Sequence, residues 1–224
     1  MTRLITIGII GVLIVLGLLD ILFKINNLNK RIEYTHSYRN DFVTFCNELQ
    51  ETKTLGGKTY TRLMQEVNRI QRELGTDGII SVYRDPLAGF QMNNYPIFLN
   101  FFNELRNYVT NFYLFEERIF LLISSADESL IKHIGNLEDA IAHNRRKLKN
   151  PVFCFSRGIN LIISLPVKVF EWGGVISEQS SSKILGSHIH RFLSKLIFII
   201  GLISSIMTIV MDWEEFISIL SEIF

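Results

Sequence analysis

The stretch LITIGIIGVLIVLGLLDILF, residues 4–23, contains a single charged residue, Asp20. A helix of about 20 apolar residues is long enough to cross a hydrocarbon core of about 30 Å. A cleaved signal peptide fits less well, because FKINNLNKR follows the run instead of a small-residue cleavage site. Asp20 falls in the last turn, where it can reach the membrane interface. Residues 1–23 are therefore predicted to be a retained transmembrane anchor.

A second apolar run, FLSKLIFIIGLISSIMTIVM at residues 192–211, predicts a second transmembrane helix, with Lys195 near its start. The following residues 212–224 contain four acidic and no basic residues and predict an acidic amphipathic tail. Residues 24–191 carry 21 basic and 17 acidic residues. Because short basic flanks stay on the cytoplasmic side, we expect a multi-pass protein of the cell (inner) membrane with a cytoplasmic middle domain and both termini outside.

Helical periodicity dominates the middle region, residues 24–191. Apolar residues recur every three or four positions over 60–74, 98–122 and 130–148, and a further helix is expected to continue from the anchor and resume at residue 42. These patterns predict an all-α fold, an antiparallel bundle of about four helices with transmembrane helices at both ends.

Local signals predict where these helices end. LGGK (55–58), GTDG (75–78) and EWGG (171–174) with the following SEQSSSK are typical of turns and loops, and SSADES (124–129) offers N-caps for a new helix. Asn150-Pro151 is expected to end or kink the helix before it, because the residue before proline is disfavoured in helical geometry. The strand-like IISVY (79–83) is too short and isolated to predict a sheet.

No motif in the chain predicts catalysis or a cofactor. LGGKT (55–59) resembles the end of a phosphate-binding loop, but Thr52 stands where the first glycine is needed. A di-metal bundle site needs paired Glu-x-x-His motifs, and the chain has only Glu33–His36, with Asp139 and His143 as a weaker pair. We therefore expect no metal site, no cofactor and no enzymatic activity.

The remaining reactive residue types favour structural roles. Cys46 and Cys154 lie among apolar residues and are too few for a disulfide framework. His188 and His190 precede the second apolar run and suit the headgroup region of a membrane.

The densest charge of the chain is Arg145, Arg146, Lys147 and Lys149. It is a candidate contact for anionic lipid headgroups, the alternative being a solvated helix face. Nucleic-acid binding is not favoured, because no aromatic platform for bases accompanies it. The semi-apolar residues 152–171 follow, and Arg157 with Lys168 make a full crossing costly, so we expect bundle core or an interfacial segment there. Membrane association of residues 152–171 stays open.

Two parts of the chain, residues 93–104 and 137–174, resemble the LemA family. They contain Asn93-Asn94-Tyr95-Pro96 before a helix, LEDAIAHNRRKLKNPVF (137–153), INLIISLP (159–166) and Gly173-Gly174. The chain departs from the family pattern at Pro151, at Phe155 and Asn160, which are out of register, and in its second anchor. The resemblance implies a membrane-anchored antiparallel bundle without established enzymatic activity.

Two functional hypotheses follow from these patterns. The first is a non-enzymatic, LemA-like scaffold that presents a cytoplasmic bundle at the lipid bilayer to a protein partner or to its own copies, with no nucleic acid involved. The alternative is a membrane-perturbing or pore-forming effector of a bacterial anti-phage system, favoured by the apolar ends and by the amphipathic tail.

Overall fold

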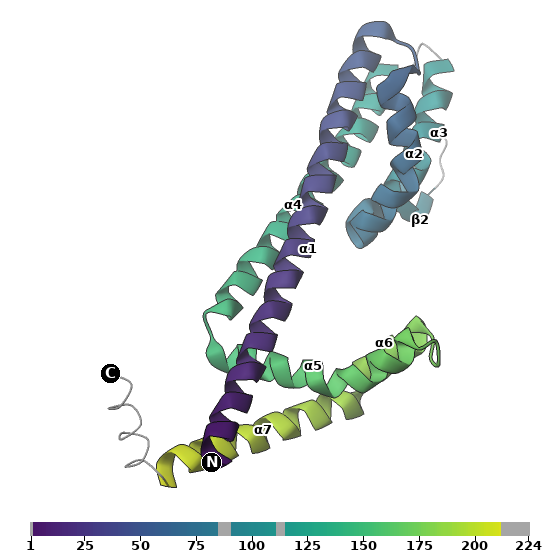
Figure 1. Cartoon of the computed structure of the whole chain (residues 1–224). Coiled ribbons are helices and arrows are strands. Elements are labelled where there is room, and N and C mark those ends of the chain that lie inside the picture. Colours follow the sequence, from purple (N-terminus) through teal and green to yellow (C-terminus); the bar gives the residue numbers. More distant parts are fainter. Residues whose placement is uncertain (1, 85–90, 111–114, 212–224) are drawn as a thin grey trace. The chain divides into compact units, whose positions relative to one another are not determined.

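The computed structural model describes residues 2–84, 91–110 and 115–211, and this part of the chain is mostly helical (Figure 1). The predicted acidic tail, 212–224, lies outside the described residues. In chain order the elements are α1 (Thr2–Thr52), α2 (Gly57–Leu74), a 3-10 helix (Gly75–Gly78), β1 (Ile79–Arg84), β2 (Gln91–Pro96), α3 (Ile97–Thr110), α4 (Phe115–Leu148), α5 (Pro151–Trp172), α6 (Glu178–Gly186) and α7 (His188–Met211).

The chain divides into two compact units. Residues Ile25–His143 form one of them, which we call the core unit. Met1–Lys24 and Asn144–Phe224 form the other, which we call the apolar unit. The core unit is continuous in sequence, whereas the apolar unit combines residues from both ends of the chain.

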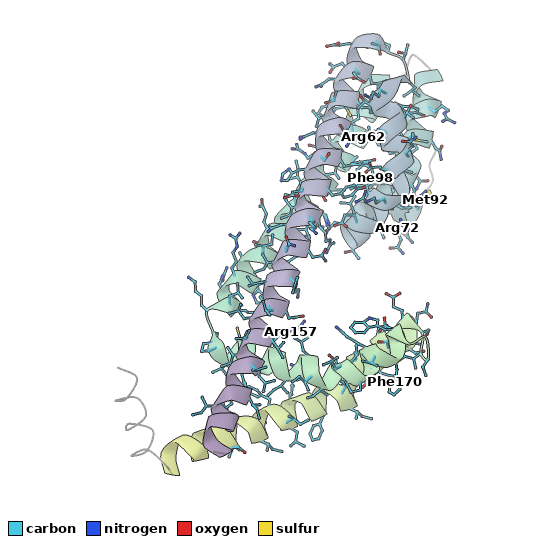
Figure 2. All side chains as sticks on the ribbon, in the orientation of Figure 1. Arg62, Arg72, Met92, Phe98, Arg157 and Phe170 are labelled. Atoms are coloured by element: carbon cyan, nitrogen blue, oxygen red, sulfur yellow. The ribbon has the colours of Figure 1, made fainter. Side chains whose placement is uncertain are left out.

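One hydrophobic cluster, built from α1, α2, α3 and α4, holds the core unit together. Aromatic rings dominate it, and several meet edge to face, the geometry that their quadrupoles favour: the Phe42 and Phe101 centroids lie 5.1 Å apart at 61°. Phe98 is fully buried among them (Figure 2). The fully buried members of the cluster are Phe42, Leu63, Ile70, Phe98, Phe101, Leu105, Ala126 and Leu130.

A β-hairpin in the core unit contradicts the purely helical prediction. β1 pairs antiparallel with β2, so IISVY does build a two-stranded sheet. Its partner QMNNYP has no apolar alternation to predict a strand. The rings of Tyr83 and Tyr95 stack at 4.4 Å, and both hydroxyls donate hydrogen bonds to Glu104 of α3. Contacts to α3, the helix that directly follows β2, thus stabilise the hairpin.

The buried amide of Gln71 on α2 binds the backbone on both sides of the hairpin, just before β1 and just after β2. Its Nε2 donates to the Gly78 carbonyl at 3.0 Å, and its Oε1 accepts from the Phe98 backbone N–H at 3.0 Å. Both backbone groups would otherwise lack a partner in a buried place, which is costly. This side chain therefore fixes where α2 ends and α3 begins.

Several predicted helix ends are correct and others are wrong. The turns at LGGK and GTDG are confirmed, with positive φ at Gly57 and Gly75. SSADES is not a break, because α4 runs through it and buries Ala126 in the core. The segment SEQSSSK belongs to helix α6, which Ser177 caps, rather than to a loop. The long pattern at 98–122 belongs to α3 and α4, on either side of residues 111–114, which lie outside the described residues.

Candidate functional site

Two described helices, α1 and α5, are long and apolar enough to cross a membrane. The predicted second span, 192–211, lies in α7, which passes this test only together with α6, across a bend of 51°. The sequence argument thus identified α1 as a candidate span and residues 192–211 as an apolar helix. It judged a crossing by residues 152–171 costly and left their membrane association open, whereas α5 is long and apolar enough to cross. The part of α1 up to Lys24, together with α5 and α7, belongs to the apolar unit, which we treat as the candidate membrane site.

Local chemistry explains why α5 begins at Pro151. Asn150 is extended, and its side chain accepts hydrogen bonds from the backbone N–H groups of Val152 and Phe153 at 3.0 and 3.2 Å. Proline suits the first helical position, where its missing N–H costs nothing. The break predicted at Asn150-Pro151 is confirmed, and the helix that follows extends for 22 residues.

Helices α1 and α5 touch backbone to backbone at two glycines. A Cβ added to Gly17 would lie 1.8 Å from the carbonyl oxygen of Cys154, and one added to Gly158 would lie 2.0 Å from that of Leu13. Any side chain larger than hydrogen is excluded at both positions. Small residues permit this close approach, which is how helices pack where water supplies no hydrophobic drive.

An ion pair lies beside the glycine contacts. Arg157, labelled in Figure 2, donates from its Nε on α5 to Asp20 Oδ2 on α1 at 2.5 Å. The two side chains are 42% and 24% exposed. The sequence analysis placed Asp20 in the last turn of its helix. This was wrong, because α1 continues to Thr52. Each charge is therefore compensated by the other helix.

Helix α7 packs on the same stretch of α5 through an aromatic contact. The Phe155 and Phe198 rings lie 6.0 Å apart, and a Cβ added to Gly201 would meet Phe155 at 3.5 Å. The apolar unit is thus joined by direct contacts of α1 with α5 and of α5 with α7.

The predicted basic cluster ends α4 immediately before α5. Arg145, Arg146 and Lys149 are exposed, whereas Lys147 is half-buried and lies 4.7 Å from the centre of the Phe153 ring. Within the described residues, the three exposed side chains make no hydrogen bond or ion pair. No acidic residue occurs between Asp139 and Glu171. The cluster is therefore an uncompensated positive charge at the start of an apolar helix.

A charge cluster that the sequence analysis missed lies in the core unit. His133 is 5% exposed, and its ring nitrogens lie 3.0 Å from Asp77 Oδ2 and 3.1 Å from Glu73 Oε1. Arg31 binds Glu73 at 2.6 Å, and Lys132 lies 3.6 Å from Asp77. Only a doubly protonated imidazole can donate at both nitrogens. Its partners come from separate helices, so no local spacing predicts the cluster.

The other sequence candidates stay apart from one another. Among the described residues, no three His, Cys, Asp or Glu side chains group as metal ligands do. Gly57 of LGGKT follows helix α1 instead of a strand, and Lys58 is exposed. Burial raises the pKa of the Cys46 thiol to about 12, with a further contribution from the charge of Asp127, so the thiolate is scarce at neutral pH.

The histidines before the second apolar run lie at the start of α7. His188 is exposed and His190 is half-buried. The His190 backbone N–H donates to Ser187 Oγ at 3.1 Å, which caps this end of the helix.

The pairing of Asp20 with Arg157 also went unrecognised, although the sequence held a signal for it. Each is a charge of opposite sign within an apolar segment, and such charges usually pair.

Comparison of the whole chain with protein-family models, with curated proteins and with solved structures finds no match.

Proposed function

We propose that the chain is a non-enzymatic membrane-anchored scaffold. Its apolar unit lies in the bilayer of a cell membrane, and its core unit, an antiparallel LemA-like bundle, is offered on the cytoplasmic side to a protein partner or to another copy. The observation that supports this most is the division into one unit with an aromatic core of its own and another dominated by apolar helices.

The exposed side chains support the membrane placement. Contiguous apolar surface is costly in water but suits lipid tails. On α5 and α7 many large hydrophobic side chains are exposed, among them Ile162, Leu165, Val169, Phe170, Phe192, Ile199, Ile200 and Ile203. The exposed side chains of α2, by contrast, include Lys58, Arg62, Arg69 and Arg72.

The basic cluster of Arg145, Arg146, Lys147 and Lys149 fits the same proposal. A charge near an anionic lipid surface contributes about 1 kcal/mol. Three exposed and uncompensated side chains next to an apolar helix would hold the end of α4 at the headgroups. The lipid bilayer is thus a partner in the proposal, through both its tails and its headgroups.

Site-specific photo-crosslinking in intact cells tests the scaffold. A crosslinker at Arg72 of the core unit should yield one discrete protein product, either a dimer of this chain or a defined heteromer. A crosslinker at Phe192 of α7 should yield mainly lipid adducts. Turnover of a nucleotide, lipid or peptide by the purified chain in lipid nanodiscs, or no protein product at Arg72, contradicts the proposal.

A pore-forming effector is the second candidate function. The observation that favours it is α5, an additional apolar helix that carries an ion pair with α1 and could line a pore upon assembly. Overexpression would then collapse the membrane potential and release small dyes from reconstituted vesicles. An unchanged potential at full expression argues for the scaffold instead.

A further inference from the structure

Helix α5 has the dimensions of a membrane span. Its 22 residues extend about 33 Å at 1.5 Å per residue, enough for a hydrocarbon core of about 30 Å. The obstacles to a crossing are its two charges, Arg157 and Lys168. Lys168 lies four residues before the helix end at Trp172, within reach of the interface for a long flexible side chain.

The contacts of α5 with α1 lie within one short stretch of each helix. Leu13 meets Gly158, Gly17 meets Cys154, and Asp20 meets Arg157. As residue numbers rise on α1 toward its exit from the apolar run at Phe23, the glycine contacts fall back toward the start of α5. The long Arg157 side chain departs from this order to reach Asp20.

The ion pair removes the main cost of the crossing. Arg157 lies six residues into α5, about 9 Å along the helix, and Asp20 lies three residues before the end of the apolar run. Both charges would therefore lie at similar depth near one face of the bilayer. Ionisable residues in membranes pair with one another, and this pair satisfies that requirement.

The flanks of α5 match the two faces of a membrane. Exposed Arg145, Arg146 and Lys149 precede it, and Trp172, 76% exposed, ends it. Basic residues favour the cytoplasmic face, and tryptophan is enriched at interfaces.

We infer that α5 crosses the bilayer beside α1, with its outer face against lipid tails and Asp20–Arg157 as the intramembrane ion pair that permits the crossing. The inference rests on the proposed membrane placement of α1. With α7 as a further span, the number of crossings becomes odd. Gln179 then lies on the membrane face opposite to Glu51, and the C-terminus lies on the same face as Glu51.

Accessibility of single cysteines tests this topology in the full chain. Both native cysteines are replaced (Cys46→Ala, Cys154→Ala), and Glu51→Cys or Gln179→Cys, at exposed positions, is added singly. A membrane-impermeant maleimide applied to sealed vesicles of one orientation should label the two variants from opposite faces. Labelling of both from the same face overturns the inference while leaving the scaffold intact. Extraction of the chain from membranes by alkaline carbonate overturns both.

Separate variants test the ion pair. Asp20→Asn leaves Arg157 unpaired, and the ratio of inserted to uninserted α5, read from the labelling of Gln179→Cys, should fall about 10- to 100-fold. Asp20→Asn with Arg157→Gln should restore the ratio, because no charge is left to bury. Lys168→Gln, which removes a charge near the end of α5, is the matched control and should leave the ratio of inserted to uninserted α5 unchanged. An unchanged ratio in Asp20→Asn, or no restoration in the double variant, overturns the role of the pair.

Discussion

Replacement of His133 by alanine tests whether the charge cluster stabilises the core unit. The imidazole separates two carboxylates, Glu73 and Asp77, which are 18% and 15% exposed. Removing a partner from a buried charged network costs about 3–5 kcal/mol, but Arg31 and Lys132 still compensate the carboxylates. We therefore expect a loss of about 2–3 kcal/mol in the free energy of unfolding, close to the value of one hydrogen bond to a charged group.

Pulse proteolysis of the full chain in detergent micelles across a urea series measures this loss. His143→Ala is the matched control, since His143 is an exposed histidine on the same helix, and its effect should stay within about 0.5 kcal/mol. A loss below about 0.5 kcal/mol for His133→Ala, equal to that of the control, refutes the argument.

The same variant predicts a change in acid stability. Burial alone would raise the pKa of Asp77, but hydrogen bonds from His133 and Asn136, with the charges of His133 and Lys132, hold it below its ordinary value. A lowered carboxyl pKa stabilises the fold fully above the unfolded value, about 3.9, and the contribution is lost as pH falls through the folded value. The wild-type chain should thus lose more stability than His133→Ala between pH 5 and pH 3 in the same assay.

Three further predictions concern packing and lipid contact. Gly158→Leu forces a side chain against the Leu13 carbonyl and should lower the melting temperature in detergent by about 5 °C, whereas Gly11→Leu, with open space around it, should not. Phe98→Ala should lower the free energy of unfolding, measured in urea, by about 3–5 kcal/mol. Val43→Ala, at an exposed position, should change it by no more than about 0.5 kcal/mol, and a smaller effect of Phe98→Ala would place this ring outside the core. Arg145→Gln, Arg146→Gln and Lys149→Gln together should weaken anionic-lipid retention in mixed nanodiscs about 100-fold, measured by native mass spectrometry. Lys58→Gln is the control, and equal retention in both refutes headgroup contact.

Elements governed by local chemistry were predictable from the sequence. The apolar run of α1, the periodicity of α2 and the break at Asn150-Pro151 each depend on residues within a few positions of one another. The glycine turns before α2 and after it depend on backbone conformations that other residues adopt at a cost.

Elements governed by distant contacts were not predictable. SSADES offers caps, yet Ala126 packs in the core and Asp127 accepts two hydrogen bonds from Arg39 of α1, so the helix continues through it. Tertiary burial outweighs a local capping preference of about 1 kcal/mol. The hairpin likewise depends on Gln71 and on α3, neither of which the strand pattern contains.

The charges of the apolar unit illustrate the same limit in energetic form. Taken singly, Arg157 argues against a membrane span, because an unpaired arginine in a bilayer costs about 2.5–3.5 kcal/mol or more. Taken with Asp20, it argues for one, because a 2.5 Å contact between two otherwise apolar helices compensates both charges at once. Arg157 thus favours one particular partner helix once Asp20 is known, and the arrangement that joins these two residues also brings Gly17 and Gly158 into backbone contact. The ion pair and the glycines therefore select the same helix arrangement by independent physical means.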